Sequence, residues 1–254
     1  MCTVVISRLP GQPWPLLIGA NRDEMASRPS RPPGRWWDDR PEVIAGLDEL
    51  AGGSWLGMND TGVVAAILNR VGTLGPQAGK RSRGELVLEA LDNADAADAA
   101  QAMADLAAGA YRPFNMVIAD NRDAFWIKAD GGHVAVRPLA PGLHMLSAQD
   151  LDDLGSPRIK AYLEPFTAAV RPEPAPDLPH GGDWNAWTRL LRDTGNPGNE
   201  SEEAPAMCFT RDSGFGTVSS SLIALPAAEL EGGRPLWLYA DSRPDRAEYR
   251  PVTT

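Results

Sequence analysis

The first residues of the chain could form a nucleophile that carries its own base. The sequence begins Met1-Cys2-Thr3, and removal of Met1 would leave the Cys2 thiol and a free α-amino group on one carbon framework. A nucleophile activated by its own terminal amine is a known catalytic arrangement. The reference pKa of an α-amino group is about 7.7–8.0, so a large fraction is neutral near physiological pH and can take the thiol proton. We therefore expect Met1 to be removed and Cys2 to be the candidate nucleophile.

A polar cluster follows an apolar run and could complete this site. Asn21-Arg22-Asp23-Glu24 comes directly after Ile18-Gly19-Ala20. Beside Cys2, Arg22 would lower the pKa of the thiol and Asp23 would hold the amine. The alternatives are an ordinary small residue at position 2 and a solvated turn at residues 21–24.

An antiparallel hairpin would bring these two groups together. Residues 3–7 are apolar and β-branched and predict a strand, while residues 8–13 contain Pro-Gly and Gln-Pro, which are typical of a turn. Residues 15–20 predict the returning strand. The hairpin would then place residues 21–24 beside Cys2.

The motifs of the whole chain resemble those of a known family. Met1-Cys2 and Asn21-Arg22-Asp23-Glu24 are followed, in order, by Gly52-Gly53-Ser54-Trp55-Leu56-Gly57, Asn59, Gly62, Asn69-Arg70, Arg81-Ser82-Arg83-Gly84, Phe114-Asn115 and Gly216-Thr217. This pattern resembles the NRDE family, which includes the transport and Golgi organisation protein 2 group. The family is similar in fold to the N-terminal nucleophile hydrolases of the bile-salt hydrolase and penicillin acylase type. The resemblance implies an α+β fold, the four-layer αββα sandwich, as one NRDE-type domain over residues 1–254.

The predicted elements agree with two stacked sheets that have helices outside them. Ser82 and Glu85 form a possible capping box for a helix over residues 83–91, and a second helix follows to residue 108. Ser156 and Pro157 predict another helix start, and Asp183 predicts the cap of a short one. The predicted strands beyond the hairpin include residues 63–68, 114–119, 124–129, 133–137, 143–147, 207–210, 217–225 and 236–241.

One further candidate site residue lies at the end of a buried strand. Residues 63–68 form an apolar run that ends in Asn69-Arg70. A turn-forming asparagine is the alternative interpretation of Asn69. In the hydrolases that the chain resembles, an asparagine at this place helps to bind the developing oxyanion.

The chain also departs from the pattern of those hydrolases. They carry an asparagine in the strand after the meander, where this chain has Leu146-Ser147-Ala148-Gln149. Gln149 or Asn115 is a possible substitute. Family members often read Gly-Thr-Arg where Val218 follows Thr217 here, and Arg211 is the nearest candidate for the arginine that the hydrolases place late in the chain.

Composition excludes several other classes of function. A net charge of −10 argues against nucleic-acid binding. No window approaches the roughly 18 uncharged apolar residues of a membrane-spanning helix, so we expect no membrane insertion. Two cysteines form no disulfide framework and favour a reducing cytoplasm. The three histidines show no zinc-like spacing.

Two main hypotheses about function remain. The first is a cytoplasmic hydrolase of a non-peptide amide, with Cys2 as nucleophile and the terminal amine as base. In this hypothesis Asp23 orients the amine, and Arg22 and Asn21 shape the charge around the thiol. Asn69 and a backbone N–H would bind the oxyanion. This hydrolase requires no cofactor or metal. The second is a non-catalytic binding or trafficking protein, with haem as a possible partner and His133, His144, His180, Cys2 or Cys208 as possible axial ligands. A third interpretation makes Cys2 a redox-sensing thiol.

Overall fold

The computed structural model describes residues 2–195 and 206–253, and Met1 lies outside them. Packing divides the chain into two compact units. The first holds the chain up to Ser27 together with Gly142–Val252, and the second holds Arg28–Pro141. The expectation of one domain over residues 1–254 stays a prediction.

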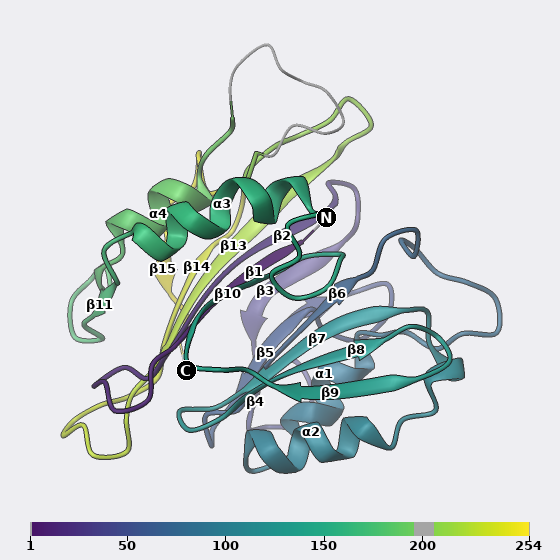
Figure 1. The fold of residues 1–254 in the computed structure, drawn as a ribbon, viewed down its shortest axis with the longest axis horizontal. Helices are drawn as coiled ribbons and strands as arrows, with labels where there is room; N and C mark the ends of the chain where they lie inside the picture. The colour runs from purple at the N-terminus through teal and green to yellow at the C-terminus, as the bar shows by residue number, and fades with distance from the viewer. Residues whose placement is uncertain (1, 196–205, 254) are drawn as a thin grey trace. The chain divides into compact units, whose positions relative to one another are not determined.

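The first unit is built on an antiparallel sheet. Its strands, in spatial order, are β10 (Gly142–Leu146), β1 (Thr3–Arg8), β2 (Leu16–Met25), β13 (Phe215–Leu225), β14 (Leu236–Ala240) and β15 (Arg250–Pro251). Two helices, α3 (Pro157–Ala168) and α4 (Asn185–Leu191), lie along one face of this sheet (Figure 1). A short ribbon of β11 (Glu173–Pro174) and β12 (Gly182–Asp183) belongs to the same unit.

Helix α3 begins as its sequence predicts, and it packs against α4. The hydroxyl of Ser156 accepts a hydrogen bond from the Ile159 N–H, with Pro157 at the first helical position, as predicted. The buried face of α3 joins an apolar cluster with Trp187 of α4. Gly19 of β2 permits this contact, because a Cβ there would lie 3.1 Å from Cε3 of Trp187.

The second unit is a longer antiparallel sheet with its own helices. Its strands, in spatial order, are β3 (Ser30–Gly34), β4 (Val43–Asp48), β5 (Leu56–Asn59), β6 (Val64–Asn69), β7 (Phe114–Ala119), β8 (Ala124–Ala129) and β9 (Val134–Pro138). The helices α1 (Glu85–Leu91) and α2 (Ala96–Ala104) pack on this sheet, and a 3-10 turn, η1, spans Ala108–Ala110. The predicted meander of three strands is confirmed by β7, β8 and β9.

Three local predictions are wrong. Asp183 does not cap α4, whose N-cap is Trp184 without a side-chain cap, because the Asp183 carboxylate accepts from the Asn185 N–H instead. Ser82 does not cap α1, whose N-cap is Gly84 and has no side-chain cap, because the Ser82 hydroxyl accepts a hydrogen bond from Gly84 N–H instead. Residues 207–210 do not form a strand, since only Thr210 makes a bridge, to Gly216. At both capping positions the side chain bonds the N–H two residues further on, so a short-range hydrogen bond replaces the predicted cap.

The predicted α+β class is confirmed within each unit. Each supplies one antiparallel sheet and helices that bury their apolar faces against it. Among the described residues, no helix combines the length and apolar character that crossing a bilayer requires.

Candidate functional site

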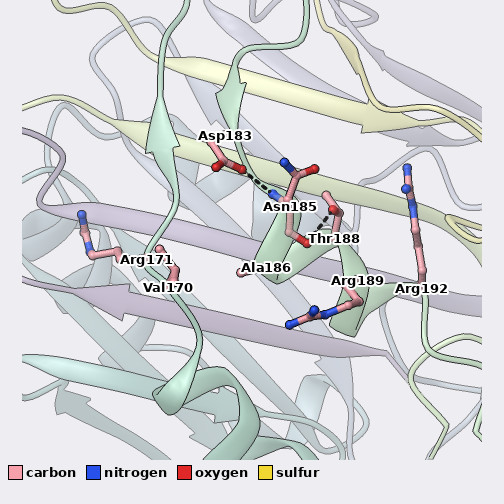
Figure 2. A pocket seen from close by; sticks show the side chains of 8 residues that line it. All are labelled: Val170, Arg171, Asp183, Asn185, Ala186, Thr188, Arg189 and Arg192. Atoms are coloured by element: carbon pink, nitrogen blue, oxygen red, sulfur yellow. Dashed lines mark hydrogen bonds between the residues drawn. The ribbon is translucent and has the colours of Figure 1, made fainter.

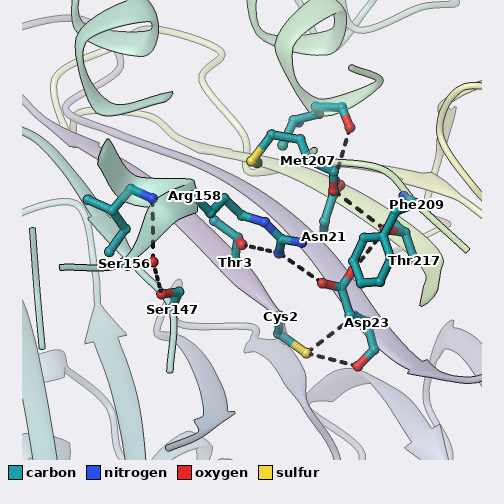
Figure 3. Close-up of polar contacts among 12 residues, drawn as sticks. Cys2, Thr3, Asn21, Asp23, Ser147, Ser156, Arg158, Met207, Phe209 and Thr217 are labelled. Carbon is teal, nitrogen blue, oxygen red and sulfur yellow. Dashed lines mark hydrogen bonds and ion pairs between the residues drawn. The ribbon is translucent and has the colours of Figure 1, made fainter. Parts of the chain in front are cut away.

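The β1–β2 hairpin places the Cys2 thiol against the backbone of Asp23. Thr3 pairs with Asn21 in the antiparallel register, so Cys2 comes opposite the next residues of β2. The Cys2 Sγ atom accepts a hydrogen bond from the Asp23 N–H at 3.3 Å and lies 3.5 Å from the Asp23 carbonyl oxygen (Figure 3). The hairpin predicted from the sequence, and the juxtaposition that follows from it, are confirmed.

The polar cluster is part of a buried strand and not a solvated turn. Strand β2 continues through it to Met25, and the exposed fractions are 1 % for Asn21, 8 % for Arg22 and 3 % for Asp23. Side chains alternate along a strand, so Asn21 and Asp23 share one face and Arg22 lies on the other. Burial of three polar residues in succession needs specific partners, because an unpaired buried polar group is costly.

The side chain of Asn21 fastens strand β2 to the segments around α4. Its side-chain amide nitrogen donates to the carbonyl oxygen of Leu191, at the end of α4, at 3.0 Å and to that of Met207 at 2.9 Å. Both donors are therefore used to fix the segments around α4. That Asn21 also shapes the charge near the thiol stays a prediction.

The carboxylate of Asp23 is held by two residues that are distant in the sequence. One oxygen accepts from Arg158 Nη1 at 2.8 Å, and the other accepts from the Thr217 hydroxyl at 2.8 Å (Figure 3). The carboxylate thus turns toward α3, while the backbone of the same residue contacts the sulfur atom.

Arg158 is the site residue that sequence reasoning missed. Besides Asp23, its Nη1 donates to the Thr3 hydroxyl at 2.8 Å, and its guanidinium lies over the ring of Phe209 at 5.3 Å. Its position in the first turn of α3 could have been read from the Ser156-Pro157 start. No local pattern marks it as the partner of Asp23, because the contact joins residues 135 positions apart.

The structure explains why glycine and threonine occupy positions 216 and 217. A Cβ at Gly216 would lie 2.4 Å from the Phe209 carbonyl oxygen, so only glycine fits there. The next residue, Thr217, is buried and pairs with Asp23, and Val218 is the extra residue of a bulge before Ser219. The motif therefore serves Asp23, and Val218 does not disturb that contact. The late arginine candidate, Arg211, is exposed and lies against the ring of Phe209.

The environment of Cys2 raises the pKa of its thiol. Burial is the main cause and the charge of Asp23 is the second, while Arg22 acts in the opposite direction and more weakly. The expectation that Arg22 gives Cys2 a low pKa and thiolate character is therefore wrong. A thiol that keeps its proton at neutral pH needs a base before it can attack a carbonyl group.

Asn69 belongs to the second unit and ends β6, as predicted. It is partly exposed, and in the described part of the chain its side chain makes no hydrogen bond. The turn that follows is closed by Thr73, whose N–H and hydroxyl both donate to the Arg70 carbonyl oxygen. The interpretation of Asn69 as a turn-forming residue is thus not supported, and its role in binding an oxyanion stays a prediction.

The two possible substitutes for the missing asparagine differ in their surroundings. Asn115 is fully buried, and its side-chain oxygen accepts from Arg70 Nη1 at 2.7 Å and from Trp126 Nε1 at 3.3 Å. Gln149 is partly exposed and follows Ala148, which is buried. The side-chain oxygen of Asn115 is thus already bonded within the second unit.

The possible haem ligands are scattered. His144 Nδ1 lies 2.7 Å from an Asp152 carboxylate oxygen, His133 and His180 are exposed, and Cys208 donates to Asp245 at 3.1 Å. Over the described ranges, no group of three or more His, Cys, Asp and Glu side chains converges as a metal site.

Comparisons with known proteins identify relatives of this chain. Residues 1–227 match the model of the family described as Transport and Golgi organisation 2. The chain is 34% identical over 143 residues to the Transport and Golgi organization protein 2 homolog of Bos taurus, and 33% identical over 141 residues to that of Homo sapiens. Each alignment covers 52% of this chain and 50% of the relative, so the chain spans about half the length of the curated relatives it matches.

Two solved structures resemble the whole fold. The Caenorhabditis elegans ortholog of N-acylethanolamine-hydrolyzing acid amidase has a TM-score of 0.56 at 12% identity, covering 98% of this chain and 99% of that one. A variant of the conjugated bile acid hydrolase from Clostridium perfringens has a TM-score of 0.50 at 12% identity, covering 100% and 97%. Identity at this level shows the fold alone, which is the predicted class of two antiparallel sheets with helices, shared with these two hydrolases.

Proposed function

The chain belongs to the Transport and Golgi organisation 2 family, and from this membership together with the Cys2 geometry we propose that it hydrolyses a non-peptide amide bond. Cys2 is the nucleophile in this proposal, after removal of Met1. The observation that carries it is the contact of the Cys2 Sγ atom with the backbone of Asp23, whose carboxylate is itself fixed by Arg158 and Thr217.

The raised pKa of the thiol supports the amine as base. A partly buried thiol beside a carboxylate stays protonated at neutral pH. The α-amino group that removal of Met1 would expose is on the same residue, and its reference pKa of about 7.7–8.0 leaves a neutral fraction that accepts the proton. An environment that disfavours the thiolate ground state suits a nucleophile that is deprotonated only as it attacks.

The proposed first half-reaction forms a thioester. The amine takes the thiol proton, the sulfur attacks the amide carbonyl carbon, and the oxygen becomes an oxyanion. As the C–N bond breaks, the leaving amine takes the proton from the terminal ammonium and departs, with the acyl group left on Cys2. Asp23 orients the terminal amine, and Arg158 and Thr217 hold Asp23.

The second half-reaction restores the enzyme. Water gives a proton to the terminal amine and attacks the thioester, and the carboxylic acid is released as the thiol regains its proton. Asn69 and a backbone N–H bind the oxyanion in both halves. The substrate class is an N-acyl amide, by analogy with the acid amidase and the bile acid hydrolase that share the fold.

The test combines mass spectrometry with a panel of N-acyl amides. We expect the intact mass to show that Met1 is gone, and brief exposure to a turned-over substrate to add one acyl group to the peptide that begins with Cys2. Cys2→Ala should lose both turnover and adduct, and Cys208→Ala is the matched control that keeps both. Retained Met1 in active protein would overturn the amine as base.

The alternative, a non-catalytic binding or trafficking protein, predicts different results. A chain that turns over no amide in the panel but shifts the visible spectrum of added haem would support a trafficking role and contradict the hydrolase. No contact in the described residues favours that alternative, so it is kept as an outcome of the test.

A further inference from the structure

The two ends of helix α3 lie in different surroundings. Beyond its last residue, a cavity of about 610 Å³ is lined by Arg171 together with Arg189 and Arg192 from α4 and its end, and these side chains point in different directions (Figure 2). They therefore converge on no common ligand. The start of α3 instead carries Arg158, the partner of Asp23. What fixes the start of this helix therefore also fixes the partner of Asp23.

The loop before α3, residues 147–156, begins close to the nucleophile. The strand that precedes it, β10, ends at Leu146, which pairs with Val4 of β1, and Val4 is two residues from Cys2. The loop ends where the first turn of α3 begins. Its conformation therefore determines where that first turn lies relative to β1.

Asp152 connects the middle of this loop to β10. One carboxylate oxygen accepts a hydrogen bond from the Met145 N–H at 2.7 Å, and the other lies 2.7 Å from Nδ1 of His144. The Asp152 N–H also donates to the Met145 carbonyl oxygen at 2.9 Å. Hydrogen bonds to an ionised carboxylate are roughly twice as strong as neutral ones, so this side chain attaches the loop firmly to the sheet.

The backbone of Asp152 is held in an unusual conformation. Its φ is 56°, and within the described ranges it is the one residue other than glycine with a positive φ. An L-residue stays in this left-handed region because its surroundings hold it there, although aspartate tolerates the region better than most. Glycine would adopt it without strain. The contacts of the carboxylate, and not the backbone, therefore give the reason for aspartate at this position.

A second hydrogen bond closes the loop across its ends. The hydroxyls of Ser147 and Ser156 lie 3.2 Å apart, and both residues are buried. The Ser156 hydroxyl also accepts from the Ile159 N–H, so the same group joins the loop to the start of α3 (Figure 3). The loop and the first turn of the helix therefore form one continuous hydrogen-bonded structure.

We propose that Asp152 is a positioning residue for the proposed amide hydrolysis. By holding the loop against β10, it sets the first turn of α3 so that Arg158 reaches Asp23. Arg158 Nη1 lies 2.8 Å from both the Asp23 carboxylate and the Thr3 hydroxyl, so a displacement of this turn breaks both contacts. The consequence for catalysis rests on the proposed function, whereas the link from Asp152 to Asp23 is measurable without a substrate.

The experiment is amide hydrogen exchange of the full chain, resolved by peptide. Asp152→Gly permits the same backbone conformation and removes the carboxylate. Exchange in residues 147–159 and in the peptide that contains Asp23 should become about tenfold faster, the size of one or two lost hydrogen bonds. Asp152→Asn keeps an oxygen for the Met145 N–H, so its increase in exchange should be smaller.

Asp153→Gly is the matched control from the same loop. The Asp153 carboxylate accepts from the Gly155 N–H at 2.8 Å, a contact that stays within the loop. This variant therefore adds the same glycine flexibility and removes the same charge, and exchange in the peptide that contains Asp23 should stay unchanged.

A double variant separates positioning from a purely structural role. In the Arg158→Met protein Asp23 has already lost this partner, so the addition of Asp152→Gly should change exchange at Asp23 no further. With an amide substrate identified, Asp152→Gly alone should lower kcat about tenfold and leave KM nearly unchanged, because a misplaced group acts on the transition state. In the Arg158→Met protein the same substitution should change kcat by less than about twofold.

Three results would overturn the proposal. They are unchanged exchange at Asp23 in Asp152→Gly, an equal change in Asp153→Gly, and an additive effect of Asp152→Gly in the Arg158→Met protein. If Asp152→Gly does not fold, Asp152→Asn decides the question, and unchanged exchange in its loop and at Asp23 would reject the proposal. Failure to find an amide that is turned over would contradict the proposed function, and the exchange measurements would still decide the link between Asp152 and Asp23.

Discussion

The polar ends of β2 and β6 differ in how far their side chains are satisfied. At the end of β2, Asp23 is buried and each of its carboxylate oxygens accepts a hydrogen bond. At the end of β6, Asn69 is partly exposed, and no hydrogen bond of its side chain exists within the described residues. Groups that position a nucleophile must be held still, whereas a group that binds a transient charge must keep its donors available.

This difference separates two kinds of contribution. A buried residue whose polar atoms all make hydrogen bonds contributes to the stability of its unit. Its substitution therefore affects folding as well as chemistry. A residue whose donors remain unused is expected to affect the rate and hardly the stability.

Replacement of the buried carboxylate should have the largest effect. Asp23→Asn leaves the Arg158 guanidinium, which is 13% exposed, without its counter-charge, and breaking a buried ion pair costs about 3–5 kcal/mol of unfolding free energy. Turnover should also fall, because a neutral amide cannot hold the terminal amine through a charge-assisted bond. Urea denaturation and kcat on an identified amide measure the two effects, with circular dichroism to verify secondary structure.

The double variant Asp23→Asn with Arg158→Met is the control for this pair. If the unpaired guanidinium causes the loss, the double variant is less destabilised than the sum of the single variants. Additive effects, or an Asp23→Asn protein with unchanged turnover, would contradict the holding role.

Asn69→Ala should lower the turnover rate and leave the stability of the protein nearly unchanged. Loss of one oxyanion donor lowers kcat by roughly 10²–10³, or about 2.7–4 kcal/mol, and KM should move little because the interaction strengthens in the transition state. The melting temperature should stay close to that of the unmodified protein. Kinetics and thermal unfolding are measured on the same preparation.

Asn59 provides a matched control from the same unit. It is buried, its amide nitrogen donates to the Leu91 and Asn93 carbonyl oxygens at 2.8 Å, and its oxygen accepts from Val63. Asn59→Ala should lower the melting temperature and spare kcat per folded molecule. A destabilised Asn69→Ala protein with normal kcat would remove Asn69 from the site.

Cys208 extends the contrast to a thiol that the proposed chemistry does not use. Burial, and then the hydrogen bond to Asp245, raise the pKa of Cys208 to about 11. The folded pKa lies above the unfolded one, so this group contributes stability below about pH 9 that is lost as the pH rises through 11. A shift of two units corresponds to about 2–3 kcal/mol. Denaturation curves from pH 8 to 11 should show a weaker pH dependence in Cys208→Ala, and identical curves would contradict the assignment.

The two thiols should also differ in accessibility, and this is the smallest effect. At pH 7 we expect a thiol probe to label Cys2 about tenfold faster than Cys208, because Cys2 is partly exposed while Cys208 is buried and bonded to Asp245. Both reactions should be slow, since both pKa values are raised. Peptide-resolved mass spectrometry gives the rates, and equal rates would reject the prediction.

The sequence predicted the parts of the site that depend on short-range geometry. A hairpin needs only two apolar runs and a turn, so the pairing of β1 with β2 and the position of Cys2 beside residues 21–24 follow from local pattern. Likewise, the apolar run before Asn69 was enough to place it at a strand end. The predicted cap at Ser82 is absent, because the Ser82 hydroxyl bonds the Gly84 N–H instead of the first turn of α1.

Local sequence pattern predicts which residues lie near Cys2, whereas long-range packing sets the groups that surround them. Arg158 is brought to Asp23 by the packing of α3 on the sheet, and Thr217 by the pairing of β13 with β2. Neither contact has a local signal, because each joins segments that are far apart in the chain. The direction of the Cys2 pKa shift was also mistaken from sequence, since Arg22 is visible there but burial is not. Desolvation is a property of packing, and here it outweighs the neighbouring charge.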